Sequence, residues 1–298
     1  MSDSQSKFHA EILASVKIIS DPAGRDILVL NHKDAARLSK KFNLRLNDLY
    51  IAAMDQGIWP RRYIRNYNTL SLTDQRLLVK SKVAIIGAGG LGGHVIQLLA
   101  RMGIGSLIIV DPDTFDETNL NRQPFATVET LDLQKTHAVK KLLESINPAV
   151  AVIPYELKLT ALNFDEILTE ADIVVDCLDS ISERLILQEA AQKLNIPLVH
   201  GALAGFEGQM MTIFPGDPGL KSFYATPEST ETDEPNPECI LGVPAITPSL
   251  IGSFQAMEVV KILLKRGRIM RRKLVYFDLD RCSLTEFSFK KNEGQASD

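Results

Sequence analysis

The stretch Val83-Ala-Ile-Ile-Gly-Ala-Gly-Gly-Leu-Gly-Gly93 decides the fold of this chain. Its first four residues are apolar and mostly β-branched, which is typical of a buried parallel strand. Gly87, Gly89 and Gly92 then form the spacing G-x-G-x-x-G. In such loops the first glycine allows a tight turn, the second lets the backbone approach a phosphate, and the third lets the next helix pack on the strand. Because a helix N-terminus attracts anions, the stretch predicts a nucleotide-binding protein.

Strand-like and helix-like segments alternate after the glycine loop. Strands are expected over residues 83–86, 106–110, 151–155, 173–176 and 197–200. One helix is expected from the glycine loop to residue 102, and others over 133–146, 162–169 and 181–194. This alternation predicts an α/β fold with a Rossmann-like, doubly wound, mostly parallel sheet. Antiparallel additions are expected over residues 208–214, 274–277 and 284–289. A helix over residues 248–264 closes the core, with its buried face expected at Ile251, Phe254, Met257, Val260 and Leu264.

Residues 1–60 are expected to form a small N-terminal helical module, and residues 61–298 the nucleotide-binding domain. Within the module we expect helices over residues 9–19, 33–42 and 46–54 and a short strand over 27–30. The segment Ala36–Leu46 resembles a helix-turn-helix, which raises DNA binding as an alternative. Acidic and basic residues are nearly balanced here, so no phosphate-binding face is evident. We therefore favour a docking or dimer-supporting role over nucleic-acid binding.

The composition of the chain indicates which classes of partner and which cellular compartment to expect. The chain has 298 residues, 45% of them hydrophobic, and a formal net charge of −4, which gives no general attraction to nucleic acids or anionic membranes. Its three cysteines include no C-x-x-C pair, which argues against disulfides and a thiolate zinc site. Neither a signal peptide nor a membrane-spanning run is present, so a cytoplasmic protein is expected. The segment Pro215–Glu238 is expected to be a long mobile loop.

Polar side chains follow the predicted strands where open α/β sheets bind their ligands. Their carboxylate, amide, guanidinium and ammonium groups suit ribose, phosphate and Mg²⁺. They are Asp111, Asp113, Asn119, Arg122, Gln123, Lys135 and Asp179. A nicotinamide dehydrogenase does not need such a set, whereas a nucleotidyl transfer that expels pyrophosphate does.

Several motifs together resemble the ThiF/MoeB/HesA family, the bacterial relatives of ubiquitin-activating enzymes. The resemblance runs from about Arg62 to Phe289 and rests on Arg62-Tyr-Ile-Arg-Asn66, the glycine loop, Asp111-Pro-Asp113, Asn119-Leu-Asn-Arg-Gln123, Lys135, Asp176-Cys-Leu-Asp179 and Gly201-Ala-Leu-Ala-Gly-Phe-Glu-Gly208. It implies an ATP-dependent adenylyltransferase that uses Mg²⁺ to activate the C-terminal Gly-Gly carboxylate of a ubiquitin-fold sulfur carrier of the ThiS or MoaD kind. The pathway implied is thiamine or molybdenum/tungsten cofactor biosynthesis.

The resemblance also implies residue roles. Gly87, Gly89 and Gly92 correspond to the nucleotide loop, Asp111 to the ribose ligand, Asn119, Arg122, Gln123 and Lys135 to the phosphate-binding set, and Asp179 to the magnesium ligand. Arg65 corresponds to an arginine that the family delivers across a homodimer interface onto the γ-phosphate. Cys239 stands where many members carry a reactive cysteine, with a leftover structural thiol as the alternative.

The sequence departs from the family in its cysteines, and alternative functions remain open. The two C-x-x-C pairs that hold a structural zinc in the family are missing, so zinc is expected to be absent. Cys177 and Cys282 are expected to be structural. A different adenylated substrate, either a peptide or a modified RNA base, is the first alternative function. An NAD-binding oxidoreductase and a non-catalytic binding module are the others. The first would leave Arg122, Lys135 and Asp179 without a role, and the intact nucleotide-binding set argues against the second.

Overall fold

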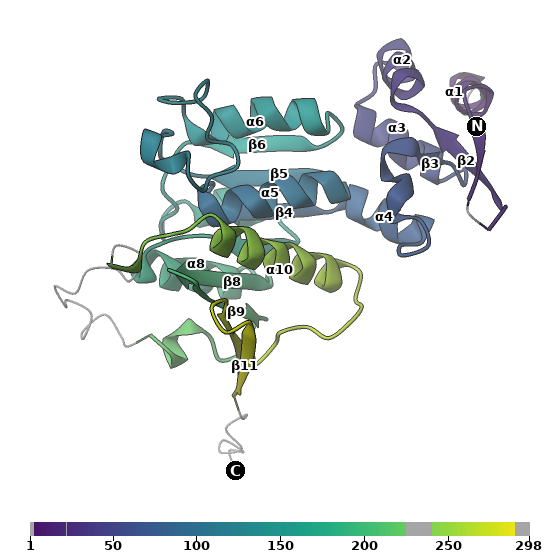
Figure 1. The fold of residues 1–298 in the computed structure, drawn as a ribbon. Coiled ribbons are helices and arrows are strands. Elements are labelled where there is room, and N and C mark those ends of the chain that lie inside the picture. Colours follow the sequence, from purple (N-terminus) through teal and green to yellow (C-terminus); the bar gives the residue numbers. More distant parts are fainter. Residues whose placement is uncertain (1–2, 22, 225–239, 290–298) are drawn as a thin grey trace.

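A computed structural model describes residues 3–21, 23–224 and 240–289, and its centre is one eight-stranded sheet (Figure 1). Its strands are β4 (Lys82–Ile86), β5 (Ser106–Val110), β6 (Ala151–Tyr155), β7 (Ile173–Asp176), β8 (Leu198–Ala204), β9 (Glu207–Ile213), β10 (Lys273–Asp278) and β11 (Ser283–Ser288). They lie in the order β11-β10-β9-β8-β7-β4-β5-β6. Strands β4 to β8 pair in parallel, and β9, β10 and β11 extend the sheet antiparallel. The predicted fold class is confirmed.

Helices cover both faces of this sheet. One face carries α5 (Gly90–Met102), α6 (Lys135–Ile146) and α10 (Ile246–Leu263), and the other carries α7 (Phe164–Leu168) and α8 (Ile181–Lys193). Because strand side chains alternate between faces, Ile85 belongs to the first core and its neighbour Ile86 to the second. Central strands buried on both faces account for the apolar runs in the sequence.

Helix α10 corrects one sequence prediction. Met257 is 52% exposed, so its place on the buried face was wrong. The helix instead buries Gln255 and Glu258 beside apolar residues. Gln255 Nε2 donates to the backbone oxygens of Asp176 and Val199, and Glu258 accepts from Thr212 Oγ1. These hydrogen-bonded polar residues break the apolar periodicity from which the buried face was predicted.

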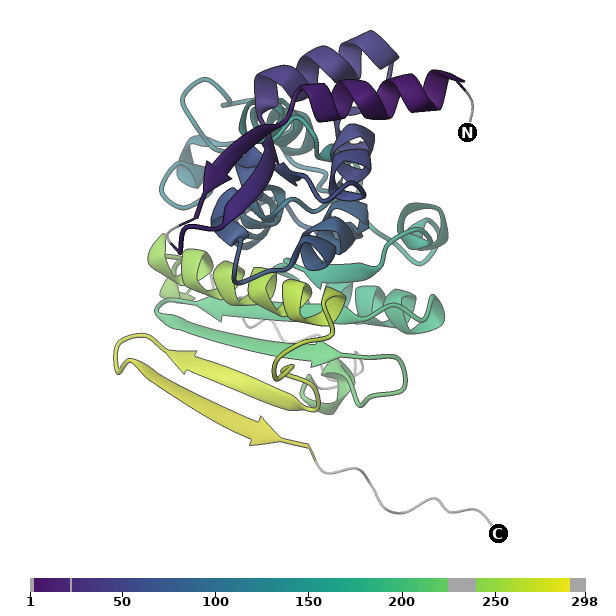
Figure 2. The ribbon, with the colours of Figure 1, turned by 90° about the vertical axis from the view of Figure 1, so that its right-hand side faces the viewer.

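A second, three-stranded sheet lies in the N-terminal part of the chain, beside the main sheet (Figure 2). This part contains α1 (Asp3–Ala14), β1 (Lys17–Ser20), β2 (Asp26–Leu30), α2 (His32–Phe42), α3 (Leu46–Met54) and β3 (Trp59–Pro60). The helix predicted over residues 9–19 is wrong at its end, since β1 pairs antiparallel with β2. The β-branched pair Ile18–Ile19 favours the strand. The domain boundary at residue 60 stays a prediction.

The remaining described segments connect these parts. They are the 3₁₀ helices η1 (Arg61–Asn66), η2 (Glu117–Asn119) and η3 (Leu220–Ser222) and the helix α4 (Leu72–Lys80). Within the predicted loop, Asp217 and Leu220 are buried, and residues 225–238 lie outside the described part of the chain. Cys282 is an exposed turn residue with φ of 49°, and its structural role stays a prediction. No helix in the described part is long and apolar enough to cross a membrane.

Candidate nucleotide-binding site

The glycine loop joins β4 to α5, and two of its glycines are required by close backbone contacts. Gly87 has φ of +98°, and a Cβ there would lie 2.5 Å from the Cys177 carbonyl oxygen. A Cβ on Gly92 would lie 1.8 Å from the Gly87 carbonyl oxygen, so only glycine lets α5 approach the strand. Gly89 has more room, with Gln123 Nε2 3.5 Å away, and lines a cavity. The N-terminus of α5 therefore opens onto that cavity with a main-chain anion site.

The cavity has a volume of about 420 Å³ and lies at the carboxyl ends of β4, β5, β6 and β7. Nine of the predicted site residues line it: Gly87, Gly89, Asp111, Asp113, Asn119, Arg122, Gln123, Lys135 and Asp179. Apolar residues line it as well, namely Ile86, Leu91, Val110, Leu157, Leu159 and Leu178. A concave site with apolar walls and a few charged groups suits a nucleotide, whose base is flat and whose phosphates are anionic.

Asp111, directly after β5, ties the glycine loop to the next strand. Its Oδ2 accepts from the Ala88 backbone N–H at 2.7 Å, and its Oδ1 accepts from that of Asp113 at 2.9 Å. Burial raises the pKa of Asp111, while the Lys135 ammonium, 3.9 Å away, opposes this shift. Lys135 Nζ also lies 3.0 Å from Asp113 Oδ2. The two carboxylates thus hold a buried cation at the cavity wall.

The segment after η2 brings an amide and a guanidinium to the same cavity. Asp116 caps η2, and Arg122 Nη1 donates to the Thr118 carbonyl oxygen at 2.8 Å. Gln123 is buried, and its Oε1 has no hydrogen-bond donor within the described residues. A buried polar atom without a partner next to the cavity fits a ligand contact.

Two predicted residues fall elsewhere. Arg65 lies in η1, is exposed, and does not line the cavity of its own chain. Gly92 lies behind the loop rather than on the cavity wall. Cys239 lies outside the described residues.

Sequence reasoning missed three charged residues that line the cavity, Lys158, Glu183 and Arg184. Lys158 and Glu183 form an ion pair between the segment after β6 and the first turn of α8. This contact raises the pKa of Lys158, with a smaller contribution from Asp179. For Lys158 the available signal was position, because it follows the carboxyl end of a parallel strand.

The carboxylates at the cavity are the groups that could bind Mg²⁺. The described residues contain no group of three or more His, Cys, Asp or Glu side chains placed to hold a metal ion. Mg²⁺ commonly binds through one or two carboxylates together with substrate phosphates. Asp179, one of the carboxylates that line the cavity, fits such shared binding better than a closed protein cage.

The fold and this cavity define a nucleotide-binding α/β protein whose ligand site combines a helix N-terminus with acidic and basic side chains. The family model described as "ThiF family" matches residues 63–297, and the chain belongs to that family. It is 35% identical to the SAMP-activating enzyme E1 of Haloferax volcanii over 205 residues, which cover 68% of this chain and 75% of that protein. It is 34% identical to the molybdopterin-synthase adenylyltransferase of Escherichia coli over 221 residues, with 74% and 88% covered.

Other relatives agree with this assignment. The sulfur carrier protein adenylyltransferase of Thermus thermophilus is 32% identical over 73% of this chain and 82% of its own length. Among solved structures, the microcin C7 biosynthetic enzyme MccB in complex with N-formylated MccA shares the fold, with a TM-score of 0.69 and 19% identity over 95% of this chain and 97% of that chain. The chain is an ATP-dependent adenylyltransferase, which replaces the oxidoreductase and non-catalytic alternatives.

Proposed function

We propose that this enzyme adenylates the C-terminal glycine carboxylate of a ubiquitin-fold sulfur carrier, for sulfur transfer in thiamine or molybdenum/tungsten cofactor biosynthesis. The support comes from relatives whose names specify a sulfur carrier protein, molybdopterin synthase or SAMP as the activated partner. The observation that carries the chemistry is the cavity that combines the α5 N-terminus with Arg122, Lys135 and Asp179.

In the proposed reaction a carboxylate oxygen of the carrier attacks the α-phosphorus of ATP. A new O–P bond forms, the bond from the α-phosphorus to the bridging oxygen breaks, and pyrophosphate leaves with the electron pair. Lys135, Arg122 and the N–H groups of α5 bind the phosphates and stabilise the charge that builds up on pyrophosphate. Asp111 and Asp113 contact the ribose, and Asn119 and Gln123 bind the phosphates together with Arg122 and Lys135. Asp179 would hold Mg²⁺, which supplies positive charge to the phosphates.

Three further assignments belong to this proposal. The active form is a homodimer in which Arg65 reaches the γ-phosphate bound by the partner subunit, because its own cavity does not include it. The enzyme holds no structural zinc. Cys239 acts after adenylation. Its thiolate attacks the carbonyl carbon of the carrier adenylate, so that a thioester forms and AMP leaves with the electron pair of the broken acyl C–O bond, or it takes part in the later sulfur transfer. Replacing Cys239 by Ser should therefore leave adenylation near wild type and reduce the later step.

ATP–pyrophosphate exchange tests the proposal directly. Labelled pyrophosphate should enter ATP only when a carrier ending in Gly-Gly is present with Mg²⁺, since the carboxylate is the nucleophile. The matched control is the same carrier without its last glycine. Exchange that is equally fast with both carriers, or absent with every carrier, would contradict the proposed substrate.

A peptide is the second candidate substrate. The MccB structure in complex with N-formylated MccA aligns with 95% of this chain, whereas the curated adenylyltransferases named above match 68–74% of it. The N-terminal segment is thus part of the shared fold. Exchange driven by short peptides, and not by carriers, would favour this alternative.

A further inference from the structure

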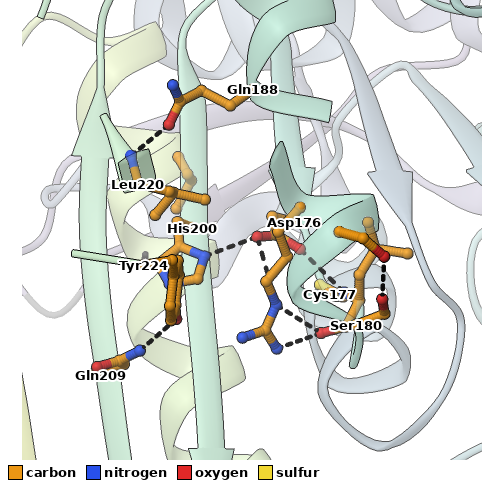
Figure 3. Close-up of polar contacts among 12 residues, drawn as sticks. Asp176, Cys177, Ser180, Gln188, His200, Gln209, Leu220 and Tyr224 are labelled. Atoms are coloured by element: carbon orange, nitrogen blue, oxygen red, sulfur yellow. Dashed lines mark hydrogen bonds and ion pairs between the residues drawn. The ribbon is translucent and has the colours of Figure 1, made fainter. Parts of the chain in front are cut away.

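In the loop between β7 and α8, side chains hold both polar backbone groups of one residue, Leu178. Figure 3 shows the polar contacts around the neighbouring Asp176. Asp176, the last residue of β7, is fully buried, and its Oδ1 accepts from the Leu178 backbone N–H at 3.0 Å. Arg184, in α8, turns back over the loop and donates from Nε to the Leu178 carbonyl oxygen at 3.1 Å. Its Nη2 donates to the same oxygen. Both polar backbone groups of Leu178 are therefore fixed by side chains.

The carboxylate of Asp176 is itself held in place by the neighbouring strand. His200 on β8 lies opposite Asp176 in the parallel register, and its Nδ1 is 2.7 Å from Asp176 Oδ2. Burial lowers the pKa of His200 despite the nearby carboxylate. Because an ionised carboxylate only accepts hydrogen bonds, the geometry assigns the hydrogen of this contact to His200 Nδ1. Arg184 Nε lies 3.9 Å from the same Asp176 oxygen, which places the guanidinium against the carboxylate.

Two further contacts enclose this cluster. Gln255 on α10 donates from Nε2 to the Asp176 carbonyl oxygen at 2.9 Å. The Tyr224 ring packs edge-on against His200 with centroids 6.3 Å apart, and its hydroxyl accepts from Gln209 at 2.7 Å (Figure 3). The end of β7 is thus fixed from a helix and from the neighbouring strand.

We propose that Asp176, His200 and Arg184 form a positioning cluster that sets the location of Asp179 at the nucleotide cavity. Asp179 follows Leu178 directly and lines the cavity, so fixing both polar groups of Leu178 limits where the Asp179 carboxylate lies. The ion pair between Arg184 and Asp176 is buried, and such a pair adds little net stability compared with apolar packing. We therefore assign it a role in positioning the loop rather than in stabilising the fold. The inference rests on the proposed role of Asp179 in binding the nucleotide with its metal.

The test compares variants that break the cluster with variants that keep its contacts. Arg184→Met removes both donors to Leu178, and Arg184→Lys keeps the charge but loses the fork. His200→Leu removes the donor to Asp176, whereas His200→Asn places an amide N–H near the original Nδ1. Gln188→Met is the matched control, because Gln188 lies on the same helix and anchors the Leu220 backbone N–H, away from the cavity.

Two readouts separate positioning from a structural role: hydrogen exchange of the backbone amides over residues 177–180, and Mg-ATP affinity by calorimetry. Arg184→Met and His200→Leu should each raise loop exchange and weaken Mg-ATP binding about tenfold, the equivalent of one lost hydrogen bond. His200→Asn should restore most of both, and Gln188→Met should change neither. If Arg184→Met does not fold, Arg184→Lys and the His200 pair decide the outcome.

Unchanged loop exchange in the cluster variants, or equal effects in Gln188→Met, would overturn the inference. Asp179→Asn is measured in parallel to separate the two claims. If that variant binds Mg-ATP as well as wild type, the proposed role of Asp179 fails. The exchange data would still show whether the cluster holds the loop.

Discussion

Gly87 and Gly92 are required by close backbone contacts, whereas Gly89 is not. The first two lie where any side chain would meet backbone atoms of Cys177 or of Gly87 itself. Backbone atoms cannot rotate away as a flexible side chain can, so the strand–helix contact leaves no alternative at these positions. Gly89 lines the cavity, and a Cβ there would find ordinary contacts with Gln123.

Gly92→Ala should destabilise the protein and abolish measurable ATP binding. The new Cβ would lie 1.8 Å from the Gly87 carbonyl oxygen, so α5 must move away from β4. We expect a loss of about 3 kcal/mol in the free energy of unfolding, the upper range for overpacking. Urea denaturation measures the loss and calorimetry the binding. Gly90→Ala is the stability control, because its Cβ has no neighbour closer than 3.5 Å, and a comparable loss there would refute the explanation.

At the scale of elements, local patterns predicted most strands and helices of the main sheet. The glycine loop and the polar residues that follow the β-branched runs also located nine cavity residues. Arg184 was missed because its side chain turns back over a loop, which depends on how α8 is placed by the sheet. Met257 was misplaced because buried Gln255 and Glu258 find partners on other elements. Periodicity contains no information on such tertiary hydrogen bonds.

Asp217, in the turn after β9, should make the stability of the fold depend on pH. Burial acts to raise the pKa of Asp217, but hydrogen bonds from Arg271, Arg272 and the Phe214 backbone N–H outweigh it and lower that pKa. A carboxylate with a lowered folded-state pKa stabilises the fold above its unfolded-state pKa, and this stabilisation is lost as pH falls through the folded-state value.

Asp217→Asn should therefore cost about 2 kcal/mol at pH 7, typical of hydrogen bonds to a charged group. The difference from wild type should shrink as the pH falls below the unperturbed value of 3.8. Urea denaturation at several pH values measures both. A difference that does not change with pH would show that the ion pairs contribute nothing.

At the scale of the whole molecule, mixing variants tests the shared active site. Arg65→Ala and Asp179→Ala should each abolish most adenylation if each cavity needs both groups. Because Arg65 would act across the interface, a mixed dimer contains one cavity with both groups intact. Mixing should therefore restore up to about half of the activity per mixed dimer, measured by pyrophosphate exchange. Arg65→Lys is the charge-preserving control. If activity does not recover once subunit exchange has been verified, Arg65 does not act across the interface.

The N-terminal part and the nucleotide-binding part share one apolar cluster. Val79 of α4 and Ala149 after α6 pack with residues of the first sixty, such as Leu49 and Trp59. Tyr63 lies against Gly103 and accepts from Asn147 Nδ2 at 2.9 Å. Two units that bury each other's side chains lose that burial together when either one opens.

Heat should therefore melt both parts in a single cooperative step. Differential scanning calorimetry should give one peak whose van't Hoff and calorimetric enthalpies agree, and two resolved peaks would contradict this. Asn147→Leu should lower that one melting temperature without splitting the peak. A chain that starts at residue 61 would expose Val79 and Ala149 to water and should aggregate. The first sixty residues are then an obligatory part of the folding unit, whichever partner the enzyme activates.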